Sequence, residues 1–338
     1  MPKRPATSSA RATTFRIVVP TYRRPGDLAT FLGAVAPQLD RRPNCTLVVV
    51  NDGSHDDAYD RAVAPYGDLV DYIAEPENRG VQYARQRGCT GADEDFLVFT
   101  DDDCVPEPFW ADWLQALVET HPGVDVFCGT TVPVETGSPS LFERFLKATG
   151  RTPMPVSTIE GLMVAPHANF ACRREMFEQV GGLDMRFSVA EDWNLTGRLL
   201  AAGATYVIDR QWITAHAVDQ GFRVNLKRWY RYGVGAAHQS IVSRDWRPVA
   251  ANADGSLTDL ARVVARPVAR FWRRTGDKPV SRGVRLCFAA LEGLFACTYQ
   301  IGWRRGLRRY SAEYGMAPPV PPMLEDTLAG FVKSESGR

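Results

Sequence analysis

The sequence predicts an α/β fold in which a mainly parallel sheet is flanked by helices. Short apolar runs alternate with stretches of helical character over residues 15–104, and this alternation is typical of a doubly wound parallel sheet. Three of the runs are followed by charged side chains. Because ligands of open α/β sheets bind outside the carboxyl ends of the strands, a ligand site is expected at that edge.

Turn-forming residues mark where the expected strands end. Pro20 stops the first apolar run, and Asn-Asp-Gly-Ser follows the second, which leaves the carboxylate of Asp52 at a strand end. The third run leads into Glu-Asn-Arg-Gly, which contains Arg79. Strands are therefore expected at residues 15–19, 46–50, 69–74 and 95–99, and helices between them at residues 27–39 and from about 80 to 88.

Three consecutive carboxylates, Asp101, Asp102 and Asp103, follow the fourth run in a D-x-D pattern. Side chains alternate along a strand, so Asp101 and Asp103 are expected to share one ligand while Asp102 points elsewhere. Hard oxygen ligands suit Mg²⁺ or Mn²⁺ carrying phosphates. The alternative is a solvated acidic turn that caps the helix expected near Pro106. With Asp52 and Arg79 at neighbouring strand ends, the pattern indicates a nucleotide diphosphate site.

The second half continues with a strand-like run and further helices. Residues 165–174 read as a strand and residues 175–180 as a helix, which the pair Gly181-Gly182 interrupts. A helix is expected over residues 193–202. A strand-like stretch at residues 205–208 is followed by Trp-Ile-Thr and then by His216.

Composition excludes some classes of function. The chain has 338 residues, of which 45% are hydrophobic, and its formal net charge of +1 argues against nucleic-acid binding. Seven cysteines without C-x-x-C spacing point to reduced thiols and no structural zinc. No signal peptide is recognised, so a cytoplasmic location is expected. Residues 1–14, rich in Ser, Thr, Ala, Pro and Arg, are expected to be disordered.

The C-terminal third predicts three helices, at residues 222–243, 257–274 and 284–310. The third is a poor transmembrane candidate because Arg285 and Glu292 interrupt its apolar stretch. Its end carries a basic aromatic cluster. These helices are expected to form a lid on the catalytic domain or a homodimer contact, or else to lie on an anionic membrane surface with access to lipid-linked acceptors.

Five motifs, taken in order, resemble those of the family 2 glycosyltransferases, which are inverting, metal-dependent enzymes of the GT-A fold. The resemblance covers about residues 15–216 and is weak or absent after about residue 221. One departure is Gln86, which stands where family members commonly have Asn. The motifs are Val-Val-Pro-Thr-Tyr, Val-Asn-Asp-Gly-Ser, Glu-Asn-Arg-Gly with Ala-Arg-Gln-Arg-Gly, Phe-Thr-Asp-Asp-Asp and Ala-Glu-Asp-Trp.

The resemblance implies a nucleotide-diphosphate sugar as donor, with a UDP-sugar favoured, and Mg²⁺ or Mn²⁺ as cofactor. It implies that Asp103 holds the metal with His216 near it, and that Asp101 touches the ribose, with Asp102 among the substrate-binding residues. Asp52 would accept a hydrogen bond from the base, because the N–H of uracil is a donor. The alternatives are a structural role for His216 and a solvated helix face for the arginines. The other donor-side residues are Pro20, Thr21, Tyr22 and Arg23 at the base, and Arg79 and Arg85 at the base or pyrophosphate.

The same resemblance implies that Asp192 is the general base. Inverting transfer needs a carboxylate to take the proton of the acceptor hydroxyl, a step worth roughly 10²–10⁴-fold in rate. Asp192 can equally be a helix N-terminal acid stabilised by the dipole, and both roles can hold together. Glu191 and Trp193 flank it as substrate-side candidates. His167 and Asn169 are candidates for acceptor contact, or for satisfying backbone groups of a buried loop.

The expected organisation is a GT-A catalytic domain at residues 15–220, with a donor half at 15–104 and an acceptor half at 105–220, followed by a helical region at 221–338. The sequence allows three classes of acceptor: a small molecule, a glycan or a lipid-linked molecule. A sugar-phosphate nucleotidyltransferase is one alternative, although residues 21–25 lack the glycines of a phosphate loop. A non-catalytic sugar-nucleotide-binding protein is the second alternative. The presence of the carboxylates expected for the metal site and the base argues against it.

Overall fold

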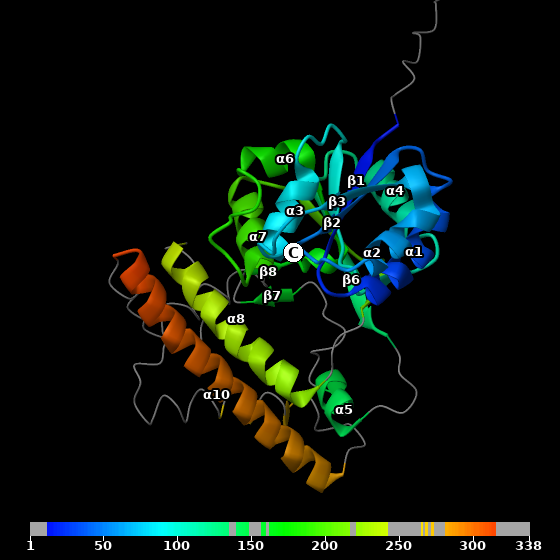
Figure 1. Ribbon diagram of the computed structural model, residues 1–338. Coiled ribbons are helices and arrows are strands. Elements are labelled where there is room, and N and C mark those ends of the chain that lie inside the picture. Colours follow the sequence, from blue (N-terminus) through cyan, green and yellow to red (C-terminus); the bar gives the residue numbers. More distant parts are fainter. Residues whose placement is uncertain are drawn as a thin grey trace, which may run out of the picture.

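A mixed eight-stranded sheet lies at the centre of the protein, with helices on both faces (Figure 1). The computed structural model describes residues 12–134, 140–148, 157–159, 162–216, 221–242 and 281–315, together with five isolated residues between 265 and 273. The strand order is β3-β2-β1-β4-β9-β6-β10-β5.

The first four strands are neighbours and parallel, as the sequence predicted. The first continues to Thr21, past Pro20, because β4 ends opposite Val18 and no strand lies beside Pro20 on that side. Thr14 is ordered and donates its N–H to Asp95 over 2.8 Å, so the expected disorder does not extend to it. Residues 1–11 lie outside the described part. The elements are β1 (Phe15–Thr21), α1 (Pro25–Leu39), β2 (Cys45–Asn51), α2 (Ala58–Val63), η1 (Ala64–Leu69), β3 (Val70–Ala74), α3 (Val81–Cys89) and β4 (Phe96–Phe99).

The second half adds antiparallel pairs to a sheet in which parallel pairs remain the majority. β9 lies between β4 and β6 and is antiparallel to both, and β5 pairs antiparallel with β10 at the edge. The strand expected at residues 165–174 is shorter because residues 167–169 form a 3-10 turn. The elements are β5 (Cys104–Pro106), α4 (Trp110–Thr120), β6 (Val126–Pro133), α5 (Leu141–Ala148), β7 (Ser157–Ile159), β8 (Leu162–Val164), η2 (His167–Asn169), β9 (Phe170–Arg173), α6 (Arg174–Gln179), α7 (Glu191–Ala201) and β10 (Tyr206–His216).

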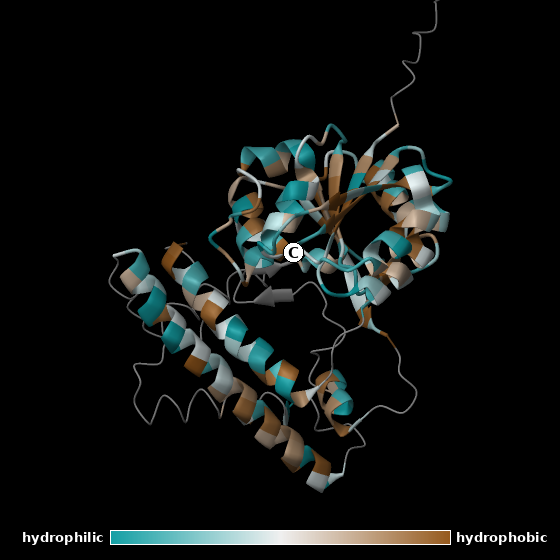
Figure 2. Cartoon of the chain, in the orientation of Figure 1, coloured by the Kyte–Doolittle hydropathy of each residue, from teal (hydrophilic) through white to brown (hydrophobic). Residues whose placement is uncertain are grey.

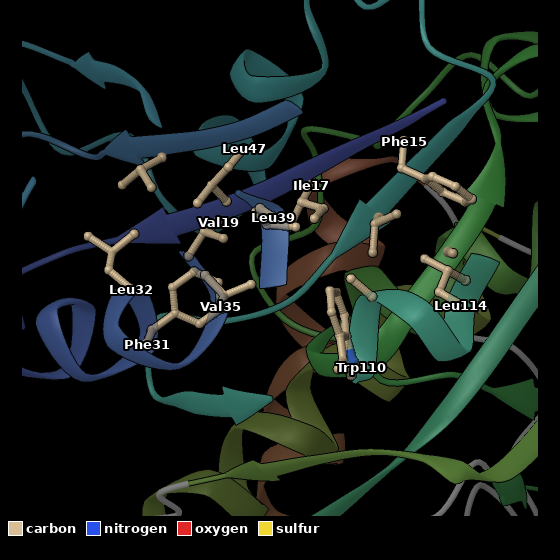
Figure 3. Packing of buried hydrophobic residues seen from close by; sticks show 14 of the residues in the cluster. Phe15, Ile17, Val19, Phe31, Leu32, Val35, Leu39, Leu47, Trp110 and Leu114 are labelled. Atoms are coloured by element: carbon tan, nitrogen blue, oxygen red, sulfur yellow. The ribbon is translucent and has the colours of Figure 1, made fainter. Parts of the chain in front are cut away.

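The alternation of side chains along β1 gives the sheet two buried faces. Phe15, Ile17 and Val19 point to one face, where they join the cluster that contains the buried side chains of α1 and α4 (Figure 3). Val18 points to the other face and joins a cluster that reaches α6 and α7 through Phe177 and other side chains. Burial on both faces explains why this strand is apolar apart from Arg16 and Thr21, and it holds the C-terminal end of the strand in a fixed position.

Two long helices, α8 (Phe222–Val242) and α10 (Arg282–Glu313), lie side by side below the sheet and run in the same direction (Figure 1). They approach closely at glycines: a Cβ on Gly233 would lie 2.0 Å from the carbonyl oxygen of Tyr299, and one on Gly302 would lie 2.1 Å from that of Tyr230. The helix expected at residues 257–274 lies largely outside the described residues. The expected domain boundaries stay predictions.

Candidate active site at the strand ends

The three carboxylates after β4 have different surroundings. Asp102 is fully buried and accepts a hydrogen bond of 2.6 Å from the hydroxyl of Thr21 at the end of β1. Asp101 forms an ion pair with Arg85 of α3. Asp103 lies 3.0 Å from Nε2 of His216. Asp102 thus anchors the turn to β1, while Asp101 contacts Arg85 and Asp103 contacts His216.

Asp101, Asp103, Cys104 and His216 form a candidate metal cluster, in which the potential ligand atoms all lie within 4.8 Å of one another. His216 reaches the cluster because β10 pairs antiparallel with β5, which places it opposite Cys104. Burial raises the pKa of the Cys104 thiol, which favours its protonated form, and its Sγ donates to the carbonyl oxygen of Ala168 over 3.8 Å. Two carboxylates and an imidazole remain, and this set fits Mn²⁺ or Mg²⁺.

Arg24 is a residue of the site that the sequence did not single out. Its guanidinium forms ion pairs with Asp102, at 2.7 Å, and with Asp103. Burial alone would lower its pKa, but the charges of these two carboxylates raise it above the usual value. The neighbouring Arg23, which was predicted to border the base, is exposed and lies over the ring of Tyr22 at 5.0 Å.

Asp52 organises the loop that starts α3. Its carboxylate accepts hydrogen bonds from the side chain of Asn78 over 2.8 Å, from the N–H of Arg79 over 2.9 Å and from that of Gly80 over 2.8 Å. Gly53, at φ 77°, allows the two loops to meet, since a Cβ there would lie 2.2 Å from the backbone of Glu77. Contact between Asp52 and a nucleotide base stays a prediction.

The two arginines assigned to the base or pyrophosphate are placed differently. Arg79 is exposed and stacks over the ring of Tyr83 at 4.1 Å. Arg85 is buried, with its guanidinium between Asp101 and Glu191, which lies 3.3 Å from it. Two carboxylates, rather than open space, therefore surround Arg85. This side chain connects the metal cluster to the start of α7.

Asp192 lies in the first turn of α7, two residues after Ala190, whose φ of 64° is left-handed. Left-handed backbone at a non-glycine residue is strained, and such strain clusters at functional sites. One carboxylate oxygen accepts the N–H of Trp193 over 2.9 Å. Burial, and then the negative charge of Glu191, raise the pKa of Asp192 to about 7. A carboxylate with a pKa near neutrality is suited to act as a general base.

Three predicted acceptor-side residues are buried and packed. Asn169 donates to the carbonyl oxygen of Trp212 over 2.8 Å and accepts the indole N–H of Trp110 over 2.9 Å, so it ties α4 to β10. His167 packs against the rings of Phe99 and Phe170, which stack on each other. Neither of its ring nitrogens has a hydrogen-bond partner among the described residues, and burial lowers its pKa.

Trp193, the third of these, faces the helical pair. It packs with Ala190, Ala236 and Trp303 in a cluster that joins α7 to α8 and α10. Tyr232 of α8, which the sequence did not single out, also lies here, and burial raises its pKa. No local pattern could have identified Tyr232, since its place depends on how α8 packs. The helical pair therefore contacts the helix that carries Asp192.

Comparisons with known proteins agree with this architecture. Residues 16–181 match the model of the family described as "Glycosyl transferase family 2". Glucosyl-dolichyl phosphate glucuronosyltransferase of Haloferax volcanii is 31% identical over 143 residues, which cover 41% of this chain and 45% of the relative. Glycosyltransferase AglE of the same organism is 26% identical over 232 residues, which cover 68% and 74%. The chain thus spans about half the length of the first relative.

Solved structures share the fold. The mannosyltransferase PcManGT from Pyrobaculum calidifontis, in complex with GDP-Man and Mn²⁺, has a TM-score of 0.58 at 17% identity and covers 87% of this chain and 88% of its own. Residues 1–349 of S. aureus TarS in complex with UDP have a TM-score of 0.50 at 15% identity and cover 91% and 93%. At such identities these structures support the fold, which is the GT-A fold.

Proposed function

Because residues 16–181 match the model of glycosyl transferase family 2, we propose that the chain transfers a sugar from a nucleotide-diphosphate donor to an acceptor hydroxyl, with inversion. The observation that carries this proposal is Arg85, which connects the cluster of Asp101, Asp103 and His216 to Glu191, the neighbour of Asp192. The residues proposed for the donor site and the residue proposed as base are thus linked through one side chain.

The donor half binds the nucleotide diphosphate in this proposal. Asp101, Asp103 and His216 would hold Mn²⁺ or Mg²⁺, which supplies positive charge against the diphosphate as the leaving group departs. Two structural neighbours were solved with GDP-Man and Mn²⁺ and with UDP, which supports a nucleotide-sugar donor. UDP is favoured here because the resemblance places recognition of uracil at Asp52. Its carboxylate is buried and already accepts N–H groups from Asn78, Arg79 and Gly80, so the N–H of uracil would be a further donor to it.

The acceptor half supplies the base. Asp192 takes the proton from the acceptor hydroxyl as its oxygen attacks the anomeric carbon on the side opposite the nucleotide. Its raised pKa makes it a stronger base than an exposed carboxylate. Glu191 is held by Arg85, so the N-terminus of α7 is fixed relative to the donor site.

A lipid-linked molecule is the acceptor class that we favour. The name of the first Haloferax volcanii relative specifies a glucosyl-dolichyl phosphate, which is a lipid-linked sugar. Trp193 packs against the helical pair, so that pair lies close to the base. An acceptor held near α8 and α10 could present its hydroxyl to Asp192.

A panel of sugar nucleotides, incubated with the protein with and without Mn²⁺, tests the proposal. We expect slow hydrolysis of one donor, by attack of water in place of the acceptor, and dependence of that reaction on the metal. The variant Asp103→Ala should lose metal-dependent nucleotide binding in calorimetry, whereas Asp68→Ala, at an exposed position, should keep it. Release of pyrophosphate from a nucleoside triphosphate and a sugar phosphate, with no hydrolysis of any sugar nucleotide, would instead support a nucleotidyltransferase.

A further inference from the structure

The outward face of α10 is apolar over half its length. Leu286 is 62% exposed, Leu294 40% and Ile301 53%, and the exposed Ala290 lies between the first two. Their spacings of four, four and seven residues place them on one side of the helix. At 1.5 Å per residue this row, the α10 stripe, is about 22 Å long.

The packing of α10 does not use the stripe. The opposite side carries Phe288 and Phe295, which pack against Phe145 of α5, and Gly302 and Trp303, which contact α8. Among the described residues, the core of the helical pair is therefore formed without the stripe. Apolar side chains left in water at regular spacing indicate a surface that another apolar partner covers.

Arginines lie at both ends of the stripe. Arg305 and Arg308 are exposed and follow Ile301 by four and seven residues, so they continue the same side of the helix. Arg282 and Arg285 lie at the other end, Arg285 over the ring of Trp272. Figure 2 shows brown and teal residues interspersed along α10, with teal frequent towards its end.

We propose that the α10 stripe lies on the surface of an anionic lipid bilayer. Its apolar side chains would enter the boundary between headgroups and acyl chains, and Arg305 and Arg308 would contact anionic headgroups. Through the contact of Trp193 with the helical pair, this orientation holds Asp192 near the membrane. Only the link to a lipid-linked acceptor rests on the proposed function.

Lying on the bilayer fits the charges better than spanning it. By length and composition alone, α10 is the one helix among the described residues that could cross a membrane. Its partner α8, however, exposes Arg223, Lys227 and Arg231, each four residues apart. A spanning pair would carry these three cations into hydrocarbon, which is costly.

A second copy of the chain fits the stripe less well. Because both ends of α10 carry arginines, a parallel or an antiparallel pair of stripes would bring arginine against arginine. Glu313 is already paired with Arg309, at 3.8 Å, and Glu292 is buried, so neither offers a compensating charge at the stripe. An anionic lipid surface offers negative charge to the arginines at both ends of the stripe.

Sedimentation with vesicles tests the proposal on the full chain. Wild type should bind vesicles that contain phosphatidylglycerol more tightly than vesicles of phosphatidylcholine alone, and added salt should weaken this binding. Leu294→Gln/Ile301→Gln should lose at least about tenfold in affinity, from the lost apolar burial. The matched control Tyr206→Gln/Ile208→Gln removes exposed apolar side chains from β10, which are 47% and 43% exposed, and should bind like wild type.

A second pair of variants tests the charges. Arg305→Gln/Arg308→Gln should weaken binding to anionic vesicles by about fivefold per arginine, whereas Arg41→Gln/Arg61→Gln, exposed on the catalytic domain, should not. Circular dichroism confirms that each variant is folded. Equal binding by wild type and the stripe variant would overturn the proposal, as would a dimer in gel filtration that the stripe variant abolishes. Vesicle binding needs no turnover, so its failure is distinguishable from failure of sugar transfer.

Discussion

Arg24 pairs with Asp103, a carboxylate of the candidate metal cluster, and the same guanidinium reaches Asp102. A protein cation therefore neutralises the acidic turn next to the position proposed for the metal. The arginine side chain is 43% exposed, so it can leave without disturbing the core. A metal ion that binds Asp103 must compete with Arg24 for that carboxylate.

Arg24→Met should strengthen the binding of Mn²⁺ in the absence of nucleotide. Methionine keeps much of the side-chain length but removes the competing charge, and a half-exposed ion pair is worth up to about 1 kcal/mol, or roughly fivefold. Calorimetric titration with Mn²⁺ measures this. Arg61→Met, at an exposed position of α2, controls for the loss of one positive charge. Weaker Mn²⁺ binding by Arg24→Met alone would show that Arg24 supports the cluster instead of competing with the metal.

UDP should stabilise the protein more than GDP, ADP or CDP in the presence of Mn²⁺. The reason is Asp52, whose carboxylate lies at the end of β2 and can accept the N–H of uracil. A thermal-shift panel of the four nucleotides measures the preference. A panel in which UDP gave the smallest shift would reverse the assignment of the base.

The close approach of α8 and α10 predicts a stability difference between two glycines of one helix. Gly302→Ala places a Cβ about as close as 2.1 Å to the carbonyl oxygen of Tyr230, and such overpacking costs about 1–3 kcal/mol. Gly283→Ala meets nothing within 4 Å and should be neutral or stabilising by up to about 1 kcal/mol. Thermal unfolding compares the two. Equal melting temperatures would mean that the helices do not pack as described.

The sequence predicted what depends on local periodicity. Apolar runs and the turn residues after them located the first four strands, and with them Asp52 and the acidic turn. The resemblance selected Arg23, which is exposed, rather than Arg24, which pairs with Asp102 and Asp103. The backbone of Arg23 is left-handed, at φ 55°, and no local pattern predicted this. Local periodicity could not predict long-range packing, and His216 was expected near the metal only because of the family resemblance. Asn169 and Trp193 are buried by partners far away in the sequence, and His216 reaches the cluster only through its pairing with β5.

Hydrolysis of the donor should depend on pH through Asp192. The base acts only when ionised, so with a pKa of about 7 the rate should fall about tenfold per pH unit below 7 and level off above it. Glu191→Gln removes a negative charge that raises this pKa, so the acid limb should move to lower pH even if the maximum rate drops. If the acid limb of the pH–rate profile did not move in Glu191→Gln, the group that titrates there would not be Asp192.

The central claim is that Asp192 takes the proton in the transfer step, and one substitution tests it most directly. Asp192→Asn keeps the size of the side chain and an oxygen that accepts the N–H of Trp193, but cannot take a proton. With the donor that the wild type hydrolyses, kcat should fall by roughly 10²-fold or more, while UDP affinity and melting temperature stay near wild type. Asp68→Asn, at an exposed position, should keep full activity. Turnover by Asp192→Asn close to the wild-type rate would contradict the account and leave Asp192 as a helix N-terminal acid.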